Sequence, residues 1–248
     1  MRIIFSRKGF DSTAGGGPSP IVDGCPLSLP IPDTKGLSRT TYGNLGLAGH
    51  AGKASSGKFG PDNFCHHDPM FLPDNKVILG QCNSSQGHLA RQKVQAGDVF
   101  LFFGLFAEEK TGERHHRIFG WLEIEEILPL AKADEANPWI QRASRRDHPH
   151  LLGLHSANGN DTLYCGPGGI ARNDSARLRL TVPGGPVSMW ARPPWLGRGE
   201  ITYFPDRDQN WPEGRLYRVG NGQEFVAPIG DRREPRQWLA RIVEEIKA

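Results

Sequence analysis

Five consecutive residues, Cys65-His66-His67-Asp68-Pro69, form the densest group of possible metal ligands in the chain. His66 and Asp68 are separated by one residue, and in an extended segment side chains two positions apart point to the same side. One imidazole and one carboxylate would then face a common ion. With a second histidine, this is the 2-His-1-carboxylate arrangement that holds non-haem Fe(II) and leaves coordination positions open. The sequence therefore predicts a metal site, with Fe(II) as the expected cofactor.

The remaining ligands of such a site have to come from other segments. His88, twenty residues beyond Asp68, is the first choice, and His116 is the next. Further histidines compete for the same role: His148, His150 and His155. A simpler interpretation needs no metal, because an aspartate before a proline often makes a local hydrogen bond in a turn.

Zinc is the alternative ion. A tetrahedral structural site would draw its ligands from cysteine and histidine, and the available set is Cys65, His66, Cys82 and His88. The chain has no C-x-x-C pair, which makes this site a weaker prediction than the iron site.

Two basic stretches are candidates for binding phosphate. Arg7, Lys8 and Asp11 precede three consecutive glycines, and a guanidinium and an ammonium there would hold an anion while the carboxylate orients them. Arg145 and Arg146 precede the His148-Pro149-His150 run, so that His150 joins a second possible anion site. The alternative is an ordinary salt-bridged surface turn for the first stretch and a solvated basic loop for the second.

Composition limits the class of protein. The chain has 248 residues, a net charge of +3 and no apolar run long enough to cross a membrane, so we expect a cytoplasmic protein without a membrane partner. Four cysteines in a reducing compartment are expected to be thiols or ligands. The patterns G-x-S-x-G, G-x-G-x-x-G and H-E-x-x-H are absent, which argues against a nucleophile-elbow hydrolase, a dinucleotide enzyme and a zincin.

The expected elements are mostly strands. Residues 97–106 form an apolar run typical of a strand buried on both faces, and residues 116–128 alternate as a half-buried strand. A serine-capped helix is expected over 84–93. Residues 234–248 carry an apolar stripe at helical spacing. With 31 glycines and 20 prolines, we predict one β-rich α+β domain over 1–248, built on a mixed or antiparallel sheet or barrel, with long loops and a C-terminal amphipathic helix.

Several segments together resemble the third class of the nucleotide modification associated domains. They are FSRKGFD and GGGPSPI within 5–21, SLPIPD at 28–33, CHHDP at 65–69, GQ and HL within 80–89, GDVFLFFG at 97–104, FGW at 119–121 and GQEFV at 222–226. The resemblance implies a setting in bacterial and phage systems that build modified DNA bases. It also implies that His66 and Asp68 occupy matching positions of a C-H-x-D-P pattern.

A second resemblance covers residues 94–128 only. Their pattern of V-x-x-G-D, an apolar strand, a loop and a strand with a late glutamate is similar to PUA-like barrels of the ASCH and EVE kind. Such a likeness implies a pocket for RNA or a modified base.

We therefore expect a metal-dependent protein that acts on bases in DNA or on nucleotides, by oxidation or by removal of a base substituent. The alternative function is a non-catalytic PUA-like reader that binds modified bases or nucleotides. The sequence gives no indication of the oligomeric state.

Overall fold

One large mixed sheet organises the chain in the computed structural model, which describes residues 1–153, 159–217 and 224–248. Its main path runs β12-β1-β6-β7-β9-β5-β4, with β2 and β3 beside β6, and β8 beside β9. The strands are β1 (Arg2–Arg7), β2 (Ser19–Val22), β3 (Cys25–Pro26), β4 (Met70–Phe71), β5 (Lys76–Gln81), β6 (Val99–Glu108), β7 (Arg114–Glu123), β8 (Glu126–Pro129), β9 (Thr162–Ile170) and β12 (Glu224–Pro228). β1 and β2 pair in parallel with β6, whereas the other pairs are antiparallel, so the predicted β-rich α+β class is confirmed.

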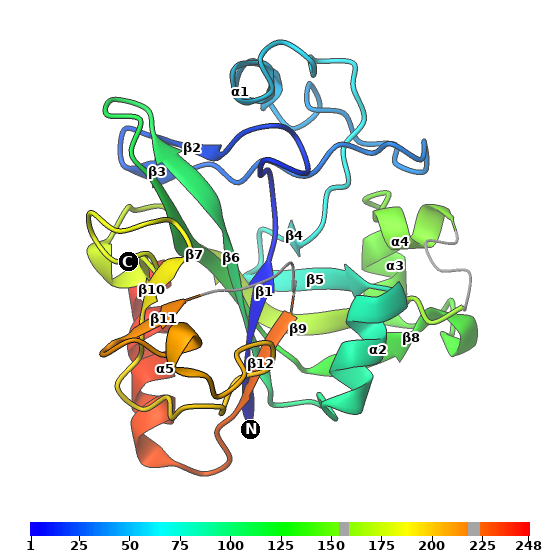
Figure 1. Ribbon diagram of the computed structural model, residues 1–248. Coiled ribbons are helices and arrows are strands. Elements are labelled where there is room, and N and C mark those ends of the chain that lie inside the picture. The colour runs from blue at the N-terminus through cyan, green and yellow to red at the C-terminus, as the bar shows by residue number, and fades with distance from the viewer. Residues whose placement is uncertain (154–158, 218–223) are drawn as a thin grey trace.

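Short helices and a small second sheet surround this curled sheet (Figure 1). The helices are α1 (Ala48–Ala54), α2 (Asn83–Arg91), α3 (Pro138–Ser144), α4 (Pro149–Leu152) and α5 (Arg233–Lys247). The second sheet pairs β10 (Met189–Ala191) with β11 (Arg215–Tyr217). Helices α2, α3 and α4 lie to the right of the sheet in Figure 1, and α5 lies to the left. None of the helices in the described part of the chain is long and apolar enough to cross a membrane.

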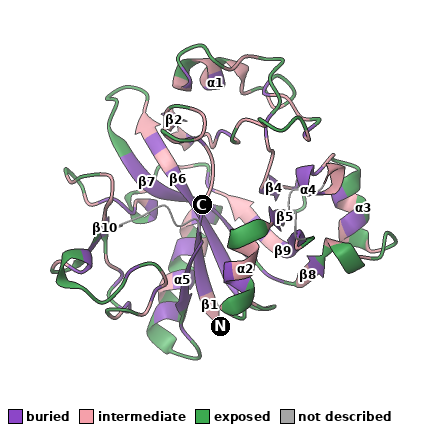
Figure 2. Cartoon of the chain, turned by 45° about the vertical axis from the view of Figure 1, so that its right-hand side comes forward, coloured by how far each residue is buried: buried purple, intermediate pink, exposed green. Residues whose placement is uncertain are grey.

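The core lies on both faces of the central strands, which appear purple in Figure 2. Helix α5 buries Leu239, Ile242 and Ile246 against the sheet, as its apolar stripe predicts. The second face is covered by another cluster that includes Phe100 and Phe102 of β6. The apolar run of β6 is therefore buried on both sides, which confirms that prediction.

The prediction of a half-buried strand over 116–128 is wrong in two respects. β7 is buried on both faces between its exposed ends, and the segment breaks after Glu123, with β8 following as a separate strand. The pairing of β7 with β6 shifts at Phe102/Phe103, where Phe119 has no opposite partner. This bulge reverses the alternation of side chains. Ile118 consequently packs in the α5 cluster, whereas Phe119 and Leu122 pack on the other face.

Helix α2 begins earlier than the sequence predicts. Cys82 is the N-cap residue in an extended conformation, and its side chain makes no capping hydrogen bond, so the expected serine cap is wrong. The helix follows β5 directly, which places its first turn at the end of that strand. This connection brings residues 80–85 to a cavity described below.

The segment around His66 is fixed by a second extended segment. The N–H of His66 donates to the carbonyl of Ile31, and the N–H of Asp33 donates to the carbonyl of Phe64. Cys65 is buried on the other side among Phe10, Leu29 and other apolar side chains of the N-terminal excursion. The ligand-rich segment therefore lies between this excursion and the sheet.

Candidate metal centre

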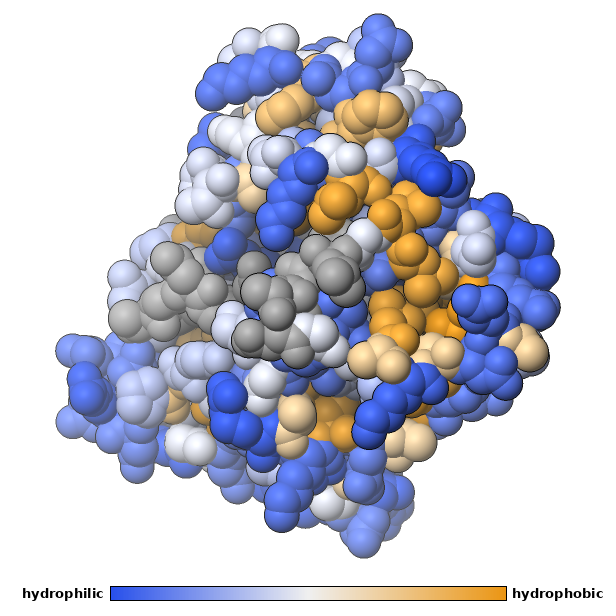
Figure 3. Space-filling view, turned by 90° about the vertical axis from the view of Figure 1, so that its right-hand side faces the viewer, coloured by the Kyte–Doolittle hydropathy of each residue, from blue (hydrophilic) through white to orange (hydrophobic). Residues whose placement is uncertain are grey.

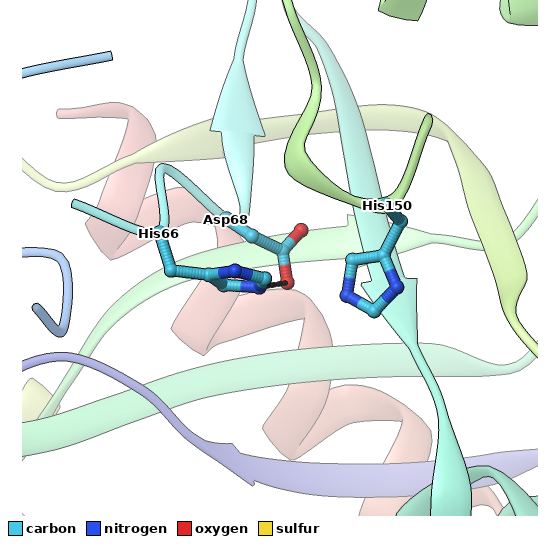
Figure 4. Close-up of side chains that lie close together, drawn as sticks. All are labelled: His66, Asp68 and His150. Atoms are coloured by element: carbon cyan, nitrogen blue, oxygen red, sulfur yellow. Dashed lines mark ion pairs between the residues drawn. The ribbon is translucent and has the colours of Figure 1, made fainter. Parts of the chain in front are cut away.

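The side chains of His66 and Asp68 point toward one another (Figure 4). His66 Nε2 lies 4.0 Å from Asp68 Oδ2. Asp68 is almost fully buried, whereas His66 keeps about a fifth of its side chain exposed. The ligand atoms of His66, Asp68 and His150 all lie within 4.8 Å of one another, and we call these three residues the candidate metal centre.

Asp68 is held by groups far away in the sequence. Its Oδ1 accepts a 2.7 Å hydrogen bond from the N–H of Gly80 in β5 and lies 3.3 Å from Nε2 of the fully buried His148. Burial alone would raise the pKa of Asp68, but contact with His148 and the positive charge of Lys8 together hold it well below its usual range. The carboxylate is therefore an anion whose Oδ2 faces His66 (Figure 4).

His150 reaches the centre from α4, whose first residue is Pro149. Its Nδ1 lies 3.0 Å from Oδ1 of the buried Asp161, which precedes β9. The imidazole also rests on Gly80, because a Cβ added there would lie only 2.1 Å from His150 Cδ2. A carboxylate on one ring nitrogen is the usual way in which proteins orient a histidine whose other nitrogen binds a metal.

Two imidazoles and one carboxylate match the ligand types that bind transition metals with open coordination positions. The three ligands of such a site share one face of the ion, so ligand atoms at about 2.1 Å from it lie about 3 Å from one another. The ligand atoms lie within 4.8 Å of one another, so the side chains have to move inward to share an ion.

The candidate metal centre borders a cavity of about 390 Å³. Arg7, Lys8 and Asp11 line it, as do Lys35 and the first residues of α2. Arg7 and Asp11 form a 2.6 Å ion pair, and Lys8 Nζ lies 3.7 Å from the buried Glu224. The volume falls within the range of small-molecule sites, about 300–1,000 Å³. The structure thus brings the first predicted phosphate-binding group to the same cavity as the candidate metal centre.

His88 and His116 lie outside the candidate metal centre and outside the side-chain groups with metal-binding geometry in the described residues. His88 Nε2 is 3.1 Å from the Thr202 hydroxyl, and its ring packs on Tyr203. His116 is buried, and the Trp190 indole donates to its Nδ1. Both were expected as ligands; their surroundings give them packing and hydrogen-bonding roles instead.

The tetrahedral zinc set is not assembled either. Cys65 is buried, its Sγ contacts the carbonyl of Thr40 at 3.5 Å, and burial raises the pKa of its thiol to about 12. Cys82 lies near a different group, with His150 and Asp161. His155 falls outside the described residues.

Arg145 and Arg146 do not line the cavity of the candidate metal centre. Arg145 borders a separate hollow with Leu130, Ile140 and Leu151. That hollow belongs to the α3 and α4 side of the molecule, where Figure 3 shows apolar side chains gathered amid hydrophilic ones. The second predicted anion site therefore contributes only His150 to the cavity.

Three contributors to the site were not predicted from the sequence as such. Gly80 donates its N–H to Asp68 and leaves the space that His150 occupies. Asp161 orients His150. His148 contacts Asp68 rather than a metal. Asp161 lies directly before a strand. No strand was predicted there, so the sequence carried no signal for Asp161.

Comparison with known proteins supports the family resemblance. A family model described as nucleotide modification associated domain 3 matches residues 2–228. The chain therefore belongs to this family, and its role lies in nucleotide modification. No curated protein and no solved structure matches the chain.

Proposed function

We propose that the protein is a metal-dependent enzyme that modifies the base of a nucleotide or of DNA. The observation that carries this proposal is the candidate metal centre of His66, Asp68 and His150 at the wall of the 390 Å³ cavity. The family supplies the substrate class, because its role lies in nucleotide modification.

Fe(II) is the ion that this proposal assigns to the centre. His66, His150 and Asp68 would hold the ion, which would supply open coordination positions for oxygen and substrate. Asp68 supports this arrangement because Gly80 and His148 engage its Oδ1, so Oδ2 is the oxygen that faces the other ligands. Zinc is the competing ion, since the same ligand types hold catalytic zinc with a bound water.

The cations of the cavity support a phosphorylated substrate. Lys8 and Arg7 lie at the end of β1 and line the same cavity as His66. Lys35 lines it as well and has no ion pair among the residues that the structure describes. Phosphate groups held by Arg7 and Lys35 would place the attached base toward the candidate metal centre.

The proposed reaction is oxidation or removal of a substituent on the base. In an oxidation, one atom of O2 enters a C–H bond of the base. The other oxygen atom combines with two protons and with two electrons from an organic co-reductant, and it leaves as water. Removal of a substituent by hydrolysis would instead use a metal-bound water and would favour zinc. The identity of the ion therefore separates the two reactions.

The first experiment measures the metal content of protein purified without a His tag. We expect about one iron per chain in the wild type, and loss of this iron in His66→Ala and Asp68→Ala with the fold retained by circular dichroism. His88→Ala is the matched control, because His88 lies outside the candidate metal centre and should keep its iron.

The second experiment incubates the protein with Fe(II), air, an organic reductant and a panel of modified and unmodified nucleotides and oligonucleotides. New products that require His66 and Asp68 support the enzyme. Binding of a modified base without turnover, and without a bound ion, would instead establish the non-catalytic reader as the function.

A further inference from the structure

Glu224, the first residue of β12, is a buried carboxyl group close to the cavity. Its side chain is 1% exposed. β12 pairs with β1 so that Glu224 lies opposite Ser6, and the Ser6 hydroxyl donates to Glu224 Oε1 at 3.0 Å. The side-chain amide of Gln81, at the end of β5, donates to the same oxygen at 2.5 Å. Three strands therefore converge on one carboxylate oxygen.

The other oxygen of Glu224 lacks such support. Oε2 is buried and has no hydrogen-bond partner in the described part of the chain. A buried carboxylate oxygen without a partner is costly, and a native structure needs a reason for it. A proton on this carboxyl group removes the cost of burying a charge.

The charged groups around Glu224 come from several elements. Lys8 Nζ is 3.7 Å from Oε1 and also lines the cavity. Asp68 and the Tyr164 hydroxyl are further titratable groups that interact electrostatically with Glu224. Lys8 is therefore the one cation among these groups, and it links Glu224 to the cavity.

We propose that Glu224 is a proton store for the chemistry in the cavity and that Lys8 is the group that passes its proton to the substrate. This proposal rests on the proposed function for the identity of the substrate. The contacts of Glu224 that support it do not involve the candidate metal centre. Glu224 is thus a positioning residue that acts through Lys8, and Lys8 is the group that meets the substrate.

The proton balance of this step is closed. Lys8 donates one proton from its ammonium group to a developing anion of the substrate, and an N–H bond of Lys8 breaks. An O–H bond of the Glu224 carboxylic acid then breaks and returns a proton to Nζ, after the two groups close the present 3.7 Å between Nζ and Oε1 to hydrogen-bond distance. The sum converts the acid into a carboxylate beside a restored ammonium, which is the ion pair that the 3.7 Å distance allows. No oxidant or reductant is needed.

The protonation state of Glu224 near neutral pH agrees with this role. The pKa of Glu224 is raised to about 7, because the effect of burial outweighs the lowering effects of Lys8 and the Ser6 hydroxyl. A general acid is most effective when its pKa lies near the working pH. Buried groups with such values gather at functional sites.

The test begins with an infrared pH titration of the intact protein, which detects the C=O stretch of a protonated carboxylic acid. We expect a carboxylic acid that ionises near pH 7 in the wild type and is absent in Glu224→Gln. Lys8→Met should move this ionisation upward by about 1 pH unit, because a neighbouring cation favours the carboxylate. Glu109→Gln is the matched control, since Glu109 forms an exposed ion pair with Lys53.

Product formation from the nucleotide panel is then measured against pH. Glu224→Gln should lower the rate by about 100-fold and remove the ionisation near pH 7 from the profile, while Glu224→Asp should restore part of both. The wild type should lose activity as the acid ionises above pH 7.

The proposal is overturned if Glu224 ionises with ordinary carboxyl groups near pH 4, or if Lys8→Met leaves its ionisation unchanged. It is also overturned if Glu224→Gln retains the wild-type rate profile. Failure of the proposed function gives a different result: the protein has neither bound metal nor turnover. In that case the infrared titration still shows a carboxylic acid that ionises near pH 7 and depends on Lys8.

Discussion

The contact between Gly80 and His150 makes a single methyl group a test of the candidate metal centre. Gly80 lies in β5, and its backbone is not in the left-handed region, so alanine is compatible with its conformation. An added Cβ would lie 2.1 Å from His150 Cδ2 and 2.7 Å from His150 Nε2. Carbon atoms in contact prefer about 3.5–4.0 Å. The imidazole must therefore move by about 1.5 Å in Gly80→Ala.

Such a movement removes His150 from coordination, because metal–ligand distances tolerate only about ±0.2 Å. Loss of an outer-shell partner typically weakens metal binding by 10–100-fold, so loss of a direct ligand should exceed about 100-fold. That factor corresponds to about 2.8 kcal/mol of binding free energy. Overpacking should lower the free energy of unfolding by about 1–3 kcal/mol, which leaves room for a folded variant.

The assay is a titration of the metal-free protein with Fe(II) under anaerobic conditions, with calorimetric or spectroscopic detection. Gly49→Ala is the control, since Gly49 lies in α1 with no atom within 4 Å of an added Cβ. The double variant Gly80→Ala/His150→Ala should bind no more weakly than His150→Ala, because both changes remove the same ligand. Wild-type affinity in Gly80→Ala would refute the assignment of His150 as a ligand.

Two further perturbations test the surroundings. Asp161→Asn should weaken metal binding by about 10–100-fold without abolishing it, because Asp161 orients His150; unchanged affinity in the same titration would contradict this role. At His115, burial and the positive charges of the nearby Arg179 and Arg117 together lower the pKa to about 4. The unfolded chain gains a proton near pH 6.5 that the folded protein resists until about pH 4, so stability should fall as pH falls through this window. Urea unfolding should show a loss on the order of 1–3 kcal/mol between pH 7.5 and 4.5, and His115→Gln should show a smaller one.

Local patterns predicted the elements of the fold well where one physical effect dominates. The apolar run of β6 and the stripe of α5 are examples, since burial alone determines both. The segment over 116–128 was different because a bulge opposite Phe102 and Phe103 reverses which side chains share a face. A bulge is set by the fit between two strands, and neither strand carries it in its own hydrophobic pattern.

For the candidate metal centre, too, the local sequence predicted one part, and contacts between distant segments determine the rest. The proximity of His66 and Asp68 follows from their spacing of two residues. The choice between His88 and His150 does not follow from spacing, because the order β9-β5-β4 decides which distant segments meet. Gly80 in β5 has no side chain, so His150 of α4 occupies that space, whereas His88 extends from α2 toward Thr202. The space beside Gly80 therefore determines which histidine approaches Asp68, and the spacing of the histidines along the sequence does not.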